Sequence, residues 1–229
     1  MEAVWRAVEA LRSGVPVMVY DGDEREAEVD LVYHASRVDV DAVYTLRTRA
    51  GGLLCFATSD EVRRGLGLPW GDELIARVPG LEALASRRLS YGDRPAFTIW
   101  VNYSGVKTGI SDSDRALTYG HLDRVVGLFY SEGPEAAREY FLSNFQAPGH
   151  VPVLAARGLG VRRGHTELSI ALALLAGLRP SVAFAEMLDY GVSLSLEKAK
   201  RISREEGWPL VSGDMIVEAC RNEEVCWRG

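Results

Sequence analysis

The feature that most constrains this fold is an acidic loop that directly follows a short apolar segment. Residues 15–20 are apolar and typical of a buried strand, whereas residues 21–30 contain six carboxylates and one arginine. Asp21-Gly22 favours a turn, and a second strand would leave the loop at about residues 27–35. The segment therefore predicts two neighbouring strands joined by a strongly charged connection.

Two interpretations of the acidic loop are open. Glu26, Glu28 and Asp30 would share one face of the second strand, because side chains alternate along a strand. Carboxylates that lie so close together raise each other's pKa unless a cation or hydrogen-bond donors neutralise them. One interpretation is a divalent-metal site, since Mg²⁺ prefers carboxylate oxygens. The other is a solvated turn, which is the more common role of a charge run and which the loop alone favours.

Composition excludes several classes of protein. The chain has 229 residues, 47% apolar and 25% charged, which is typical of a globular protein with a sizeable core. A net charge of −6 and the lack of a basic stripe argue against a nucleic-acid partner. The longest apolar stretch, residues 168–178, is too short to cross a bilayer, and residues 1–6 do not resemble a signal peptide. We therefore expect a cytoplasmic protein that does not bind membranes.

The three cysteines do not indicate a metal site or a disulfide framework. Cys55 lies in an apolar run, where a small buried hydrophobic residue is the expected role. Cys220 and Cys226 are close enough in sequence to pair, and the sequence leaves their state open.

The apolar pattern predicts helices that alternate with strands. The helices are expected at residues 2–13, 39–49, 59–66, 81–87, 111–119, 135–143, 166–177, 195–206 and 214–221. The strands are expected at residues 15–20, 27–35, 53–57, 97–101, 151–155, 160–161, 182–188 and 209–211. No repeat or linker interrupts the pattern. It predicts an α+β fold, with one domain over residues 1–229 and a mixed β-sheet flanked by helices.

Two loops that precede predicted helices have features of anion sites. Residues 105–115 place glycines and hydroxyls, including Thr108, where free backbone N–H groups attract phosphate. Without the Walker spacing, this loop is weak evidence. Residues 161–167 add Arg162 and Arg163, which suit a phosphate, and His165, which could ligate a metal. A charged loop that leads into a buried helix explains the second segment equally well.

Two single residues complete the set of candidates. Glu186 lies in an otherwise apolar strand, and carboxylates are seldom buried without a partner, so we favour a functional role. His150 precedes another strand, where a lone histidine is more often structural. Together with the acidic and arginine-containing loops, these residues indicate a metal-dependent enzyme that acts on a sugar phosphate.

Six motifs occur in a fixed order between about residues 4 and 215. They are Asp21-x-x-x-Arg25-Glu26-x-Glu28-x-Asp30, Gly52-Leu53-Leu54-Cys55, Gly105-Val106-x-Thr108-Gly109-Ile110-Ser111-x-x-Asp114-Arg115, Pro148-Gly149-His150-Val151, Arg163-Gly164-His165-Thr166-Glu167, and Ala176-Gly177-Leu178 followed by Glu186. In this order the motifs resemble those of the 3,4-dihydroxy-2-butanone 4-phosphate synthase family. The resemblance implies conversion of D-ribulose 5-phosphate to 3,4-dihydroxy-2-butanone 4-phosphate and formate in riboflavin biosynthesis.

The resemblance also implies a homodimer, two Mg²⁺ or Mn²⁺ ions per active site, and roles for individual residues. Glu26 and His165 would be the metal ligands. Substrate contacts would come from Arg25, Glu26, Asp30, Thr108, Arg162, Arg163, Gly164, His165, Thr166 and Glu186. His150 and Glu186 would be catalytic, with Glu186 as a general acid or base. Asp21, Glu28 and Cys55 would line the site, whereas Asp23 and Glu24 would be solvated.

The chain departs from the usual family pattern at several positions. Ala27 and Val29 replace the common Asn and Gly between the acidic residues, and Lys107 replaces a frequent Thr. An arginine that often follows His150 is missing. We therefore expect a divergent member of archaeal type. We also expect a monofunctional one, because the cysteine-rich cyclohydrolase domain often fused to this family is lacking.

Two other functions remain open at this point. One is a metal-dependent isomerase or aldolase that acts on another sugar phosphate. The other is a regulator that binds a metal or a metabolite without turnover. Release of formate from ribulose 5-phosphate distinguishes the synthase from both.

Overall fold

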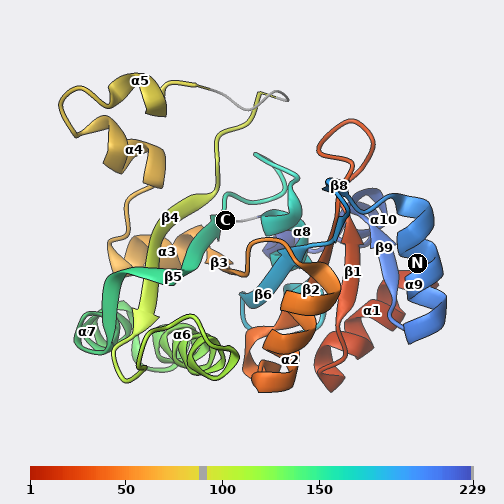
Figure 1. Cartoon of the computed structure of the whole chain (residues 1–229), viewed down its shortest axis with the longest axis horizontal. Helices are drawn as coiled ribbons and strands as arrows, with labels where there is room; N and C mark the ends of the chain where they lie inside the picture. The colour runs from red at the N-terminus through yellow and green to blue at the C-terminus, as the bar shows by residue number, and fades with distance from the viewer. Residues whose placement is uncertain (88–91, 228–229) are drawn as a thin grey trace.

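The computed structural model describes residues 1–87 and 92–227 and is built around a seven-stranded sheet in the order β4-β5-β3-β6-β2-β1-β9 (Figure 1). Its strands are β1 (Val17–Tyr20), β2 (Val29–His34), β3 (Cys55–Ser59), β4 (Phe97–Tyr103), β5 (Phe145–Ala156), β6 (Ser181–Glu186) and β9 (Leu210–Ser212). The β3–β5 and β1–β9 pairs are parallel, and the other neighbours are antiparallel. A small hairpin of β7 (Leu188–Asp189) and β8 (Val192–Ser193) follows β6. The predicted α+β class and mixed sheet are confirmed.

Helices cover both faces of the sheet because its strands bury side chains on both sides. On one face lie α1 (Glu2–Ser13), α8 (His165–Leu175) and α10 (Gly213–Ala219). On the other lie α2 (Val40–Thr45) with its π-helical extension η2 (Leu46–Ala50), α3 (Asp60–Leu66), α6 (Asp112–Glu132), α7 (Pro134–Asn144) and α9 (Leu196–Glu206). In β1, Met18 points toward the second group, whereas Val17 and Val19 point toward the first. The strands therefore sit in the middle of a three-layer arrangement.

Most predicted elements are confirmed with shifted ends, but two local predictions are wrong. Residues 160–161 form a turn rather than a strand, because Gly158 has a positive φ of 86° and its carbonyl accepts from the N–H groups of Val161 and Arg162. The second missed feature is the helix α4 (Gly71–Ala76), which buries none of its side chains and so shows no apolar period. The short helix predicted at 81–87 is α5 (Glu82–Ala85).

All three cysteines are buried and free. The thiols of Cys220 and Cys226, which the sequence left open, lie in hydrogen-bond contact with each other. In the described part of the chain, no helix combines the length and the apolar content needed to cross a bilayer.

Leu172 on α8 is fully buried against the sheet, so its substitution is a test of where the core lies. We expect Leu172→Ala to lower the free energy of unfolding by about 2–5 kcal/mol, because the lost methyl groups leave a cavity. Urea denaturation followed by circular dichroism measures this change. Leu142→Ala on α7 is the control, since that side chain is 58% exposed and its loss should cost less than about 0.5 kcal/mol. Equal losses in the two variants would contradict the assignment of the core.

Candidate active site

The acidic loop is folded by one of its own carboxylates. Asp21 is buried, and its oxygens accept hydrogen bonds from the backbone N–H groups of Glu26 (3.1 Å) and Glu28 (3.2 Å). Residue Ala27 adopts a left-handed φ of 54°, and β2 begins only at Val29. The prediction that Glu26, Glu28 and Asp30 share one strand face is therefore wrong, because only Asp30 lies within the strand. The loop, rather than a strand face, brings Glu26 to the site.

The register of the central strands brings three predicted site residues to the same end of these strands. Asp30 of β2 pairs with Glu186 of β6, and Cys55 of β3 pairs with Phe184 two residues before it. One oxygen of Glu186 accepts from the Leu53 N–H at 2.7 Å. Asp30 and Cys55 are almost completely buried, with exposed fractions of 1% each.

Gly52 allows the chain to pass Glu186 closely. A Cβ atom at this position would lie 2.3 Å from the Glu186 Oε2 atom and 2.6 Å from its backbone oxygen. The Gly52 N–H also donates to that backbone oxygen at 2.9 Å. A side chain at position 52 would therefore displace the carboxylate, which explains physically why this motif contains glycine.

His165 is the first residue of α8 and lies buried opposite the acidic loop. Its Nδ1 atom is 3.6 Å from Glu26 Oε2, and its Nε2 atom is 3.6 Å from Asp30 Oδ1. The same Nε2 lies 3.1 Å from the backbone oxygen of Glu28. The Glu28 side chain accepts from the Ser193 hydroxyl at 2.5 Å, which connects the loop to β8. The contacts of His165 thus join the first and fifth predicted motifs in space.

Burial and mutual charge dominate the electrostatics of this cluster. Burial opposes a charged imidazole, but the carboxylates of Asp30, Glu26 and Asp21 outweigh it and raise the pKa of His165 to about 9. Burial, reinforced by the neighbouring carboxylates, raises the pKa of Asp30 to about 8, although His165 acts in the opposite direction. Burial also raises the pKa of Glu186, and that of Cys55 well above its usual range. Without a metal, the cluster therefore holds protons at neutral pH that isolated side chains would release.

The donor set suits a hard divalent ion. Ligand atoms of Asp21, Glu26 and His165 all lie within 4.8 Å of one another. The buried Oδ1 of Asp30 accepts no hydrogen bond from the described residues, although buried carboxylate oxygens are normally paired. Three carboxylates around one imidazole are ligands that a Mg²⁺ or Mn²⁺ ion can use. Asp21 thus joins Glu26 and His165 as a candidate ligand.

Arginines line a polar cavity of about 420 Å³ beside this cluster. Arg25 donates to Asp93 at 2.7 Å, and Arg162 donates to the fully buried Glu167 at 2.5 Å. Arg162 Nε also lies 3.6 Å from the same Asp93 oxygen. Arg163 borders the cavity, and its Nε donates weakly to a backbone oxygen at 3.4 Å. Sequence reasoning missed the anchoring roles of Asp93, which depends on contacts distant in the chain, and of Glu167, whose place at the third position of α8 was the local signal.

Gly164 and Thr166 complete the predicted loop at the start of α8. Gly164 is the N-cap residue, and its N–H donates to Glu167 at 3.2 Å. A Cβ atom on Gly164 would lie 2.3 Å from the Arg162 guanidinium, so glycine is needed for the arginine to cross the loop here. Thr166 is buried in the first turn of the helix.

Thr108, in the loop after β4, and His150, on β5, form a second group, and both residues are exposed. The Thr108 N–H and hydroxyl donate to Asp114 Oδ2 at 3.2 and 3.3 Å. The described hydrogen bonds of His150 go to Asn102 of β4, which sequence reasoning did not identify. The structure thus brings the predicted residues together in two groups, one around His165 and one around Asn102.

A comparison with protein-family models matches residues 5–219 to 3,4-dihydroxy-2-butanone 4-phosphate synthase. The chain belongs to this family. A synthase from Methanosarcina mazei is 39% identical over 228 residues, covering 95% of this chain and 91% of its own length. A synthase from Archaeoglobus fulgidus is 38% identical over 224 residues, covering 94% of this chain and 92% of its own length. The predicted family, and with it the prediction of an enzyme, is confirmed. The two relatives also agree with the expected archaeal type.

Solved structures support the same assignment. The Candida albicans synthase is 28% identical with a TM-score of 0.71, covering 94% of this chain and 96% of its own. A synthase crystallised in complex with two magnesium ions is 26% identical with a TM-score of 0.76, covering 98% of this chain and 99% of its own.

The raised pKa values predict that a divalent metal stabilises the synthase more at high pH. In the metal-free native state Asp30 keeps its proton to about pH 8, whereas the ordinary pKa of this side chain, 3.8, applies in the unfolded chain. His165 keeps its proton to about pH 9 in the native state, against an ordinary pKa of 6.5. Folding therefore takes up protons, and metal-free stability falls as pH rises through these ranges. Because Mg²⁺ binds only deprotonated ligands, it should raise Tm more at about pH 9 than at about pH 6.

Thermal unfolding with Mg²⁺ or with a chelator, at both pH values, measures this difference. The comparison is made within each pH, so titration of groups elsewhere in the chain cancels. A metal-induced shift that is equal at both pH values, or smaller at the higher one, would contradict the protonation states of the cluster.

Proposed function

We propose that residues 1–229 form one synthase domain that converts D-ribulose 5-phosphate to 3,4-dihydroxy-2-butanone 4-phosphate and formate in riboflavin biosynthesis. The observation that carries this proposal is the buried His165 facing Glu26 and Asp30, next to an arginine-lined cavity, in a chain of this family. The reaction requires removal of a proton next to a carbonyl, loss of water, a carbon shift and release of formate. Each step moves charge on oxygen atoms that such a cluster can stabilise.

Asp21, Glu26 and His165 would hold a divalent ion, Mg²⁺ or Mn²⁺, in this proposal. When bound, the ion would supply Lewis-acid polarisation of the carbonyl and hydroxyl oxygens of the substrate. The related structure with two magnesium ions supports two ions per site. The additional carboxylates of Glu28 and Asp30 beside the first three ligands supply the negative charge that a second ion needs.

The substrate phosphate would bind at the start of α8, where Arg163 borders the cavity and the first backbone N–H groups, those of His165 and Thr166, need no partner within the helix. Arg25 and Arg162, which both lie beside Asp93 at the same cavity, would add positive charge. Asp30 and Glu26 would then face the sugar hydroxyls. Thr108 would contact the substrate from the second group.

Glu186 would exchange protons with the substrate carbon or oxygen. Its raised pKa fits this role, since a general acid or base works best when its pKa approaches the working pH. The Leu53 N–H donates to one carboxylate oxygen, Oε2, and orients the group. Asp30, buried beside it with a raised pKa, could hold a proton during the same sequence. His150 would act on the substrate from the second group, while Cys55 lines the site as a buried neutral thiol.

We expect the protein to release formate from ribulose 5-phosphate in the presence of Mg²⁺. Glu26→Gln and His165→Ala should abolish this release without unfolding the chain, because each removes a metal ligand. Formate is measured with a coupled dehydrogenase, and folding by thermal melting. Glu9→Gln is the control, since it neutralises an exposed carboxylate on α1, outside both groups. Full turnover in both site variants would contradict the proposed metal site.

Two other outcomes of that assay identify the alternatives. Consumption of a different sugar phosphate without formate would indicate an isomerase or an aldolase. Binding of metal and phosphate without any turnover by the parent protein would indicate a regulator.

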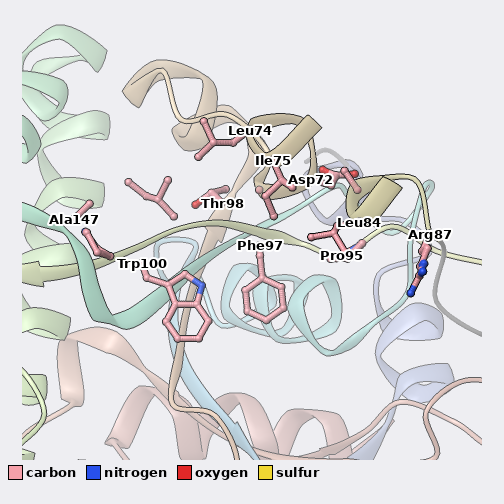
Figure 2. A pocket seen from close by; sticks show the side chains of 14 residues that line it. Asp72, Leu74, Ile75, Leu84, Arg87, Pro95, Phe97, Thr98, Trp100 and Ala147 are labelled. Atoms are coloured by element: carbon pink, nitrogen blue, oxygen red, sulfur yellow. The ribbon is translucent and has the colours of Figure 1, made fainter. Parts of the chain in front are cut away.

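We further propose that the enzyme is a homodimer in which one copy covers the exposed Thr108 and His150 of the other. A strongly apolar cavity of about 700 Å³ lies between α4, α5 and β4 and ends at Pro148, two residues before His150 (Figure 2). Its lining includes Leu84 and Trp100, whose exposed fractions are 61% and 42%. An apolar surface of this kind is typical of a protein interface. A catalytic histidine also needs protection from water, which the partner would supply.

Mixing of inactive variants tests whether His150 acts in the site of the partner. A heterodimer of Glu26→Gln and His150→Asn chains would combine both defects in one site and leave the other intact. Random exchange of subunits in a two-fold dimer should then restore about a quarter of the parental activity. Mixing Glu26→Gln with His165→Ala is the control, because both defects lie in the same cluster and every site stays defective. If neither mixture recovers activity after the subunits have exchanged, a site shared between the two subunits is contradicted.

A further inference from the structure

Asn102 connects the two parts of the second group, although no motif identified it. It lies on β4 with an exposed fraction of 2%, so its amide must find its partners within the protein. The ladder between β4 and β5 shifts register here, with Val101 opposite Val151 but Asn102 opposite Gln146. The intervening residues, which include His150, bulge out of the ladder beside Asn102.

Close packing places the Asn102 side chain in a narrow space. A Cβ atom on Gly149 would lie 2.2 Å from the Asn102 backbone nitrogen. A Cβ atom on Gly109 would lie 2.1 Å from the Asn102 Nδ2 atom. Gly109 thus allows the Thr108 loop to approach the Asn102 side-chain amide, and Gly149 allows the His150 segment to approach the backbone of the same residue.

The hydrogen bonds of Asn102 fix the orientation of its amide. The His150 backbone N–H can only donate, and it lies 2.7 Å from Oδ1, so this atom is the amide oxygen. The amide nitrogen, Nδ2, therefore has two hydrogens to place. It lies 3.3 Å from the backbone oxygen of Thr108 and 3.1 Å from the ring Nδ1 of His150.

We infer that Asn102 is a positioning residue that holds neutral His150 with its proton on Nε2 and ties it to the Thr108 loop. One Nδ2 hydrogen goes to the Thr108 oxygen, and the other goes to His150 Nδ1, which must accept it with its lone pair. The alternative, a proton on Nδ1 donated to Oδ1 at 3.3 Å, would leave one amide hydrogen without a partner among the described residues. The chosen arrangement satisfies every donor and acceptor of the amide.

This assignment refines the proposed function, on which it rests, by defining what His150 offers to the substrate. With Nδ1 occupied, the ring presents an N–H group at Nε2 rather than a lone pair. A neutral imidazole N–H can donate to a carbonyl oxygen that gains negative charge when a neighbouring carbon loses its proton. Removal of that proton then falls to a carboxylate such as Glu186, and His150 keeps its own proton throughout.

Asn102→Asp tests the inference because aspartate has the same shape but cannot donate. Its carboxylate would repel the Thr108 oxygen and would require a proton on His150 Nδ1. Long-range proton–nitrogen NMR spectra of histidine-labelled protein distinguish protonated from unprotonated ring nitrogens. The His150→Asn spectrum identifies the His150 signals. We expect unprotonated Nδ1 in the neutral parent, protonated Nδ1 in Asn102→Asp, and a kcat lowered about 100-fold or more in that variant.

The KM for ribulose 5-phosphate should change much less than kcat, since the proposed metal and phosphate ligands lie in the other group. Asn222→Asp makes the same substitution at an exposed site and should leave both the spectrum and kcat unchanged. An active parent with a protonated Nδ1 would overturn the inference, whether or not Asn102→Asp folds. A parent that releases no formate would instead overturn the proposed function.

Discussion

The active site depends on one electrostatic constraint, the burial of His165 among carboxylates from the acidic loop and β2. Each of these charges alone would be costly to remove from water, so each requires the others. The arrangement is set by backbone structure: the register of β2 against β6 places Asp30, the N-terminus of α8 places His165, and Asp21 folds the loop that carries Glu26. The metal-free state satisfies the charges with protons, which a divalent ion can replace. Metal binding and proton release are therefore coupled by the same contacts that stabilise the site.

The second group follows a different design, in which neutral hydrogen bonds replace charge. Asn102 joins the Thr108 loop to His150 through one buried amide, on β4 at the edge of the sheet. An edge strand leaves its outer side uncovered by the same chain, which suits residues that meet a partner subunit. The charged group lies instead at central strands, where helices on both faces exclude water. Burial from within the chain thus serves the charged group, and in the proposed homodimer a second copy would bury the neutral one.

Much of this organisation could be predicted because it depends on patterns of residues that are close together in the sequence. The strands and helices around the site have clear apolar periods, and the motifs named Glu26, Asp30, His165 and Glu186 before their positions were known. What could not be predicted depends on tertiary contact. Asp93 and Asn102 act by holding other site residues, and nothing in their neighbourhood along the chain signals this. The turn at residues 158–162 was missed because a positive φ at Gly158, rather than the apolar content of Val161, decides the local structure.

The arginines around the polar cavity show how such contacts limit function. Arg162 is bound to Glu167, whose carboxylate is fully buried, so withdrawing this guanidinium would leave a charge unpaired in the interior. Asp93 is different, because its side chain is 26% exposed and it interacts with both Arg25 and Arg162 through one oxygen. In the proposed function, a phosphate group that reaches these arginines would therefore compete with Asp93 rather than with Glu167. Such an exchange would replace one anion with another at a partly solvated position, so that the buried Arg162–Glu167 pair would stay intact while the substrate binds.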